Sequence, residues 1–235
     1  MSEGIAWIGD RKYDARADGA GMLEGISLTL ARGVEPEEFL LRLGADEDQL
    51  LCGDLYRERH ELDIPQPRPG PVTQDNPQFN CGMYGTCGEW VYALEDWGVA
   101  TWFMGYHSTM APLVGEEWIC ISVDRHVGPN LILHAPGLAV PGEDGRTYQA
   151  EFGSDTDRSS ALDAALEAVG AVYPSQYNGG VSTEQEQMTY WEEHREELPA
   201  RVFTAVGQYC DVSIDQAMVE AGDLPLIILP MPQTY

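Results

Sequence analysis

Lysine is almost absent from this chain of 235 residues, in which Lys12 is the only one. Thirteen Lys and Arg face 39 Asp and Glu, which gives a formal net charge of −26 at pH 7. Contacts to nucleic-acid phosphates need clustered basic side chains, and so does attachment to an anionic lipid surface. The composition therefore excludes an ordinary nucleic-acid-binding protein and disfavours a protein held on a membrane by charge. The single lysine also argues against Schiff-base and P-loop chemistry.

Long apolar runs are missing as well. The longest near the end of the chain, residues 224–229, contains Pro225 and is far shorter than the ~20 residues of a membrane span. The first 18 residues lack the apolar stretch of a secretion signal. Five cysteines form a sparse, odd-numbered set, which is typical of a reduced compartment. We therefore expect a cytoplasmic protein with no membrane partner.

Signature motifs of enzymes are also lacking. The chain contains no P-loop, no dinucleotide-binding glycine motif, no His-Glu-x-x-His pair, no nucleophile elbow and no EF-hand loop. No cofactor is expected on this basis. The absences leave open an enzyme with dispersed residues, built around Cys87, His107, His126 or His134.

Cys81 and Cys87 are weak candidates for a redox or metal role. The residues between them, 82–86, include two glycines and predict a turn before a strand. Five intervening residues are more than the two to four of structural zinc sites, and no second Cys or His pair lies nearby at the usual interval. The alternative is that both are small, half-buried residues in a tight turn.

The acidity does not indicate disorder, because 43% of the residues are hydrophobic and six Trp and eleven Tyr are present. The length suits one large domain or two small ones, and we expect a single α+β domain over residues 1–235, with a proline-rich loop or insertion at 64–80. Short spacings between alternating segments predict a mainly antiparallel sheet of about five or six strands. Helices are expected to pack on this sheet and to dominate the C-terminal third.

Hydrophobic periodicity and turn residues place the individual elements. Strands are expected at 25–31, at 88–96 with 99–105 as its hairpin partner, at 117–124 paired with 130–135, and at 147–152, with 224–229 as a short edge strand or extended tail. Helices are expected at 35–43, 46–62, 160–169, 183–198, from Pro199 to about 209, and at 213–221 with Ser213 as its N-cap. The expected core consists of Ile26, Leu28, Leu30, Leu40, Leu43, Trp90, Tyr92, Leu94, Ile119, Ile121, Leu131, Leu133, Leu162, Leu166, Phe203 and Val206.

The strongest acidic feature lies on the helix expected at 183–198. Glu192, Glu193, Glu196 and Glu197 place like charges four residues apart, which costs a few tenths of a kcal/mol per pair. A helix that tolerates this repulsion can present a negative field to a basic protein. The alternative is a solvated outer face without a partner.

Four segments carry a resemblance to a known family: the strand and helix opening at 25–46, the strand Trp90 to Gly98, the strand pair at 117–135 and the helix at 161–170. Together they resemble a domain of unknown function that is common in high-GC Gram-positive bacteria. The resemblance spans roughly residues 25–225. It implies an α+β fold in a bacterial or bacteriophage cytosolic setting, and it carries no known catalytic residues.

Three functions follow from these observations. The first is a non-enzymatic acidic binding protein, of the immunity, inhibitor or nucleic-acid-mimic type, which acts on a basic protein and does not bind nucleic acid directly. The second is an enzyme with dispersed Cys, His and Asp residues. The third is a structural or assembly subunit, whose oligomeric state the sequence leaves open.

Overall fold

The computed structural model of the chain describes residues 4–10, 26–51, 78–95, 101, 115–122, 131–135, 148–150, 161–172 and 183–231. Strands and helices fold together, which confirms the predicted α+β class. The strands are β1 (Ser27–Arg32), β2 (Phe79–Cys87), β3 (Trp90–Glu95), β4 (Glu117–Ser122), β5 (Leu131–Ala135), β6 (Tyr148–Ala150) and β7 (Leu226–Pro230). The helices are α1 (Ala6–Asp10), α2 (Pro36–Arg42), α3 (Glu47–Leu51), α4 (Ala161–Ala168), α5 (Glu184–His194), α6 (Leu198–Cys210) and α7 (Gln216–Ala221).

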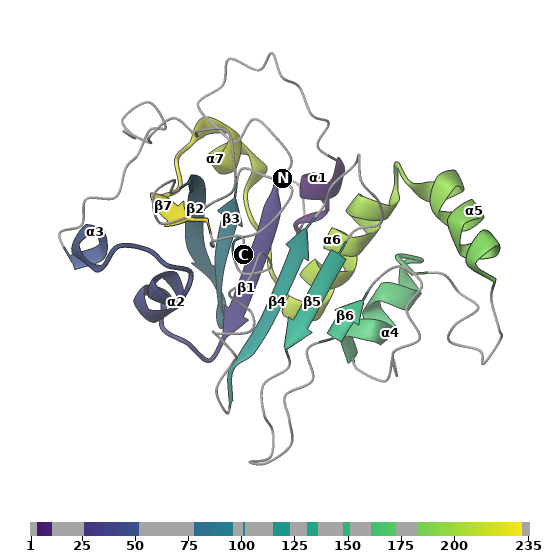
Figure 1. The fold of residues 1–235 in the computed structure, drawn as a ribbon, viewed down its shortest axis with the longest axis horizontal. Helices are drawn as coiled ribbons and strands as arrows, with labels where there is room; N and C mark the ends of the chain where they lie inside the picture. The colour runs from purple at the N-terminus through teal and green to yellow at the C-terminus, as the bar shows by residue number, and fades with distance from the viewer. Residues whose placement is uncertain are drawn as a thin grey trace.

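The seven strands form one sheet in the order β6-β5-β4-β1-β3-β2-β7, and each neighbouring pair is antiparallel (Figure 1). This is one or two strands more than predicted. The strand β1 lies between β3 and β4, at the centre of the sheet. Its residues Ser27 to Ala31 are buried.

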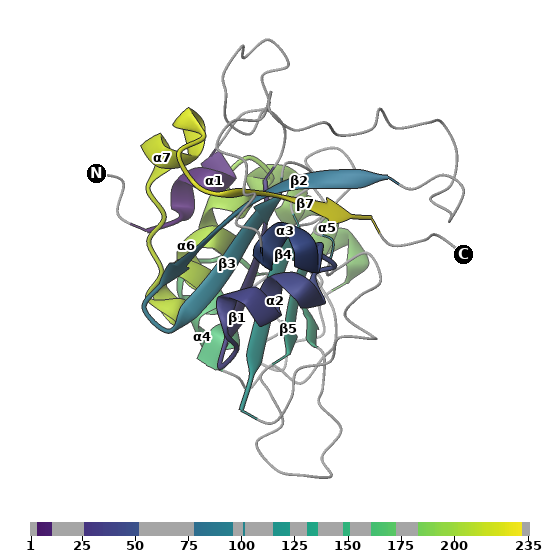
Figure 2. The same cartoon turned by 90° about the vertical axis from the view of Figure 1, so that its left-hand side faces the viewer.

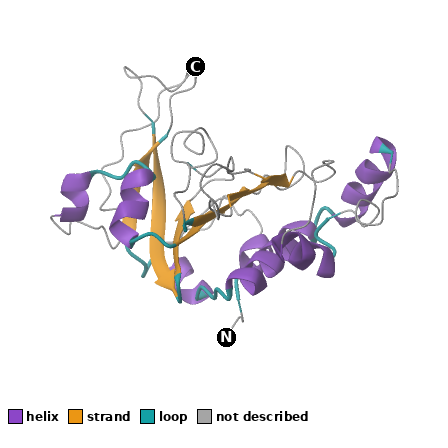
Figure 3. Cartoon of the chain, turned by 90° about the horizontal axis from the view of Figure 1, so that it is seen from below, coloured by secondary structure: helices purple, strands orange, loops and turns teal. Residues whose placement is uncertain are grey.

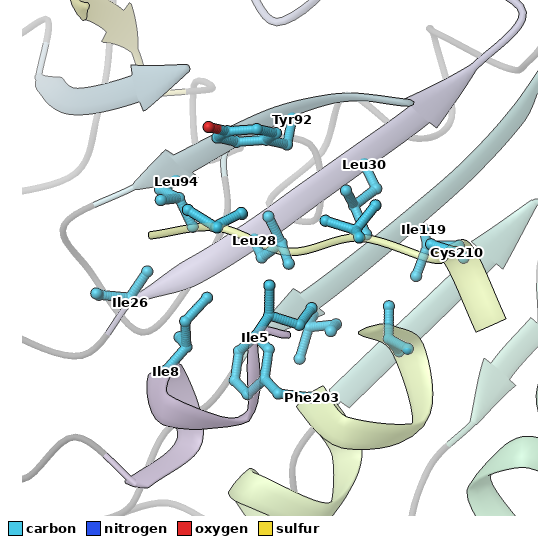
Figure 4. Packing of buried hydrophobic residues seen from close by; sticks show 14 of the residues in the cluster. Ile5, Ile8, Ile26, Leu28, Leu30, Tyr92, Leu94, Ile119, Phe203 and Cys210 are labelled. Carbon is cyan, nitrogen blue, oxygen red and sulfur yellow. The ribbon is translucent and has the colours of Figure 1, made fainter. Parts of the chain in front are cut away.

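One face of the sheet, here called the α6 face, is covered by α1, α4, α6 and α7 (Figures 1 and 3). Alternate strand residues such as Leu28, Tyr92 and Ile119 meet Phe203 of α6 in a continuous apolar core (Figure 4). The side chains of Ile8 in α1 and of Ile5, the residue before this helix, join this core. Burial on this scale stabilises the fold by roughly 25 cal/mol per Å² of apolar surface.

The opposite face, here called the α2 face, is covered by the first helices after β1 (Figure 2). Pro36 stands in the first turn of α2, where its missing N–H costs nothing, and Phe39 packs on Trp118 with ring centroids 5.2 Å apart. Arg42 Nη1 donates to Glu116 Oε2 at 2.6 Å, which joins α2 to the start of β4. The sheet is therefore buried on both sides.

The helix α5 stands at the periphery, away from the sheet, in both Figure 1 and Figure 3. None of its described side chains is buried. It begins with a capping box in which Thr183 Oγ1 accepts from the Glu186 backbone N–H and Glu186 accepts from that of Thr183. The predicted helix over 183–198 ends earlier, at His194, and a turn separates it from α6.

Three further predictions need correction. The glycine-rich segment before residue 88 is a strand, β2, whose first residues 79 and 80 belonged to the predicted loop at 64–80. The partners of β3 are β1 and β2, so residues 99–105 are not its hairpin partner. The N-cap of α7 is Asp215, which accepts from the Ala217 N–H at 2.8 Å, and not Ser213.

The expected core is confirmed where side chains are described. Every residue expected there is buried, apart from Leu131, whose side chain lies outside the described part. The sequence prediction did not include α1, which places Trp7 and Ile8 in the core, with Ile5 just before it. Residues 52–77 also lie outside the described residues, and with them most of the predicted proline-rich loop and of the helix at 46–62.

Candidate functional site

Charged and aromatic residues gather at one end of the sheet, on the α6 face. Arg32 is in register with Trp90 on one side and with Glu117 on the other. Cys87 is in register with Trp90 across the hairpin of β2 and β3. Because directly paired residues share a face of the sheet, these four side chains project toward α6.

The carboxylate of Glu117 is the centre of this group. Its Oε1 lies 2.7 Å from His134 Nε2 and accepts a hydrogen bond from the Tyr209 hydroxyl at 2.6 Å. Its Oε2 accepts from Arg32 Nη2, whose guanidinium stacks 5.2 Å from the ring centroid of Trp90. We call Arg32, Glu117, His134 and Tyr209 the Glu117 cluster, which joins β1, β4, β5 and α6.

The surroundings of the cluster shift its ionisation in favour of a charged Glu117. Burial raises the pKa of the Glu117 carboxyl, but hydrogen bonds from His134 and Tyr209 and the charge of Arg32 outweigh burial, so this pKa lies below its ordinary value. Burial and the hydrogen bond to Glu117 raise the pKa of the Tyr209 phenol. Burial also raises the pKa of the nearby Cys210 thiol, which keeps it protonated and unreactive at neutral pH.

The geometry of the Glu117 cluster fits a structural role. His134 and Glu117 are each about 3% exposed, whereas the Arg32 side chain is 45% exposed. Among the described residues the carboxylate contacts an imidazole, a phenol and a guanidinium, and none of these contacts is a Ser or Thr hydroxyl or a Cys thiol. His134 is the one predicted catalytic histidine that the structure describes, and it lies in this buried network; His107 and His126 lie outside the described residues.

Cys81 and Cys87 lie on the same strand, six positions apart. A strand rises about 3.3 Å per residue, so their Cα atoms are roughly 20 Å apart, too far for a disulfide or a shared metal ion. Cys87 Sγ accepts from the Ser213 N–H at 3.5 Å, and Cys81 is buried in the core. The predicted redox or metal role therefore cannot involve both thiols at one site.

The four predicted partner-facing glutamates are exposed but belong to two elements. Glu192 and Glu193 are on the last turns of α5, and Glu196 and Glu197 lie in the turn before α6. The predicted repulsion within one helix, between residues four apart, therefore does not apply in that form. Glu196 is 77% exposed and pairs with Arg195 at 3.7 Å. Glu197 is 64% exposed and pairs with Arg201.

Contacts with the end of α4 and with α6 hold this acidic segment in place. The Tyr190 hydroxyl donates to the carbonyl oxygen of Gly170 at 3.1 Å, and Arg201 Nη1 donates to the same oxygen at 3.1 Å. Gly170 has a φ of +66°, the left-handed conformation that ends α4. We call residues 183–197 the acidic arm.

The structure also shows a buried polar group that sequence reasoning missed. Glu95 ends β3 and is 0% exposed, on the α2 face. Burial, opposed by hydrogen bonds from Thr101 and Asn80, raises the pKa of its carboxyl to about 7. Its position near the end of the strand expected at 88–96 gave no indication that its side chain would be buried.

Comparison with known proteins identifies no relative: no protein-family model, curated protein or solved structure matches the chain. In the part of the chain that the structure describes, no helix is both long enough and apolar enough to cross a bilayer. Nor do the described residues contain a group of three or more His, Cys, Asp or Glu arranged to hold a metal ion.

Proposed function

We propose that this protein is a non-enzymatic acidic binding protein whose acidic arm docks on a basic protein, as an immunity protein, an inhibitor or a nucleic-acid mimic does. The observation that carries the proposal is an exposed arm, outside the core, that presents Glu192, Glu193, Glu196 and Glu197. The proposed setting is the cytoplasm of a bacterium or a bacteriophage-infected cell, and the partner surface is rich in Arg and Lys.

The burial pattern of α5 supports this function. A surface helix normally buries an apolar stripe against the body, and this burial supplies most of its stability. The described side chains of α5 are exposed or half-exposed, and two polar contacts hold the helix: the capping box at Thr183 and the hydrogen bond from the Tyr190 hydroxyl to the carbonyl oxygen of Gly170. A helix that contributes so little to the core is available for contact with a partner.

The charge of the whole chain supports the same function. A net charge of −26 steers a basic protein toward the surface and speeds encounter, and this effect weakens as salt is added. Arg195 of the arm and Arg201 of α6 neutralise Glu196 and Glu197 in part, whereas no described cation pairs with Glu192 or Glu193. These two carboxylates are therefore expected to contribute most to binding.

The test compares three baits in a nuclease-treated lysate of the native host. The first is the unchanged protein, and the second carries Glu→Gln changes at Glu192, Glu193, Glu196 and Glu197. The third is a control with the same change in charge, in which Glu89, Glu167, Glu220 and Asp223, all exposed on the body, become amides. We expect one basic protein to bind the first and third baits at low salt, to elute as salt rises, and to be absent from the second.

Other outcomes contradict the proposal in distinguishable ways. Equal retention by the arm variant and the control would show that the arm is not the contact surface. Binding that is undiminished by high salt would exclude the electrostatic mechanism. Recovery of the protein's own chain alone would favour an assembly subunit, and an empty bait would favour an enzyme.

A further inference from the structure

One side of α5 carries large apolar side chains that are open to solvent. Met188 is 45% exposed and is one of three large hydrophobic residues that are exposed in the described part of the chain. Trp191 follows three positions later and is partly exposed. Neither residue belongs to the apolar core on either side of the sheet. The described packing of the body therefore does not explain why these two side chains are apolar.

The contact of α5 with the body lies on another side of the helix. Tyr190 and His194 are four residues apart, and their ring centroids lie 4.4 Å from each other. The Tyr190 hydroxyl donates to the carbonyl oxygen of Gly170 at 3.1 Å. With 3.6 residues per turn, Met188 lies about 160° from Tyr190 around the helix axis, and Trp191 lies about 100° from it. Both apolar residues are therefore turned away from this contact.

Charged residues border the two apolar side chains. Met188, Trp191, Glu192 and Arg195 have the spacing i, i+3, i+4 and i+7, which places them along one side of a helix. We call these four residues the Trp191 face. The Arg195 guanidinium lies 6.0 Å from the ring centroid of Trp191 and also pairs with Glu196, so its charge is used within the arm. The face thus combines apolar side chains with the carboxylate of Glu192, which no described cation neutralises.

This combination is typical of a binding surface for a basic protein. Trp, Met and Arg are enriched in protein–protein interfaces, and residues at this spacing are those with which an amphipathic helix contacts an apolar surface of its partner. A second copy of the chain would bring negative charge to both sides of the contact, and an anionic lipid surface would repel the carboxylates. Charge complementarity therefore selects a basic protein.

We propose that the Trp191 face binds an apolar surface that is bordered by Arg and Lys on a basic protein. This inference rests on the proposed function, in which the acidic arm docks on such a protein, and it adds the kind of surface that the arm recognises. The carboxylates speed the encounter and depend on salt, whereas burial of Met188 and Trp191 stabilises the complex at every salt concentration. A surface that is basic but not apolar is consequently bound more weakly.

The first test uses two synthetic helical peptides of equal length and charge as probes, titrated into the full chain in a calorimeter. One peptide has a stripe of leucines between rows of lysines, and the other has glutamines in place of the leucines. We expect the unchanged chain to bind the leucine peptide at least tenfold more tightly, because burial of one large apolar side chain is sufficient for a change of this size.

Variants of the chain locate the site of this preference. The double variant Met188→Gln/Trp191→Gln keeps every charge of the arm and should bind the two peptides with similar affinity. The matched control Leu51→Gln/Met218→Gln changes the other two exposed large hydrophobic residues, 72% and 41% exposed, and should keep the tenfold preference. If the double variant does not fold, Met188→Gln alone changes an exposed side chain and should reduce the preference by about threefold.

The outcomes separate this inference from the proposed function. Equal affinity of the unchanged chain for the two peptides, or an equal loss of preference in the double variant and its control, would overturn the inference. A partner that is bound through the glutamates of the arm, but equally well by the double variant, would also overturn it and would leave the proposed function intact. A preference that depends on Met188 and Trp191 but not on those glutamates would support the inference and contradict the acidic contact of the proposed function.

Discussion

Replacing Glu117 with Gln should destabilise the fold by about 3–5 kcal/mol, the usual cost of removing one partner from a buried ionic group. The variant keeps the size of the side chain but loses the negative charge that His134, Tyr209 and Arg32 all contact. Each charge-assisted hydrogen bond contributes about 1.5–3 kcal/mol, and the part due to Arg32 is smaller because its side chain is 45% exposed. For a chain of this length the melting temperature should fall by roughly 10 °C.

Urea denaturation followed by far-UV circular dichroism measures this change directly. The Tyr209→Phe variant, which removes one of the three donors, should lose about 1.5–3 kcal/mol. The control Glu89→Gln, on an exposed turn, should stay within about 0.5 kcal/mol of the unchanged protein. A loss below about 1 kcal/mol for Glu117→Gln would refute the reasoning, because it would mean that the carboxylate is not the centre of the network.

Three further tests concern the packing of the helices and the pH dependence of stability. Gly9→Ala places a Cβ 2.3 Å from the backbone N of Ala200. Calorimetry should therefore show that the free energy of unfolding falls by about 1–3 kcal/mol, or that the variant does not fold. An unchanged melting temperature would exclude the close contact of α1 with α6. Asp215→Ala removes the N-cap of α7 and should cost about 1 kcal/mol in urea denaturation, whereas an equal loss in Ser213→Ala would mean that the cap is misassigned. Because the pKa of Glu117 is lowered in the folded state, its carboxylate stabilises the fold above the ordinary carboxyl pKa, and this stabilisation is lost as the pH falls toward the lowered value. The stability of Glu117→Gln should therefore lack this part of the pH dependence in acid denaturation. An acid transition identical to that of the unchanged protein would contradict the lowered pKa.

Local patterns were sufficient to predict most of the sheet. In β1 and β3 the apolar residues alternate with a period of two, and Leu28, Leu30, Tyr92 and Leu94 point to the same face as expected. The strand β2 was missed because its glycines resemble those of a turn. At Gly85 the role of glycine is steric, since a Cβ there would lie 2.4 Å from the Tyr92 hydroxyl and 2.7 Å from the ring carbon that carries it.

Contacts between distant residues account for what the sequence did not predict. The motif from Ser213 to Gln216 satisfies the pattern of a capping box, but the carbonyl of Ile214 accepts from the Trp7 indole at 2.9 Å, and the helix begins after it. The Glu117 cluster brings together four residues that are scattered over 177 positions from Arg32 to Tyr209. The register of β1, β4 and β5 places Arg32, Glu117 and His134 near one another, and the packing of α6 on the sheet adds Tyr209. The acidic arm, in contrast, was found directly from its composition, because exposure of local charge needs no tertiary contact.

The most direct test of the proposed function is the affinity of the captured basic protein for the unchanged chain, the arm variant and the body control, measured by calorimetry over a series of salt concentrations. The arm variant and the body control carry the same net charge, so the comparison separates the position of the acids from their number. The proposal predicts tight, salt-sensitive binding by the unchanged chain, similar binding by the body control, and a loss of at least tenfold in the variant of Glu192, Glu193, Glu196 and Glu197. Equal affinity of the two variants at every salt concentration would contradict it.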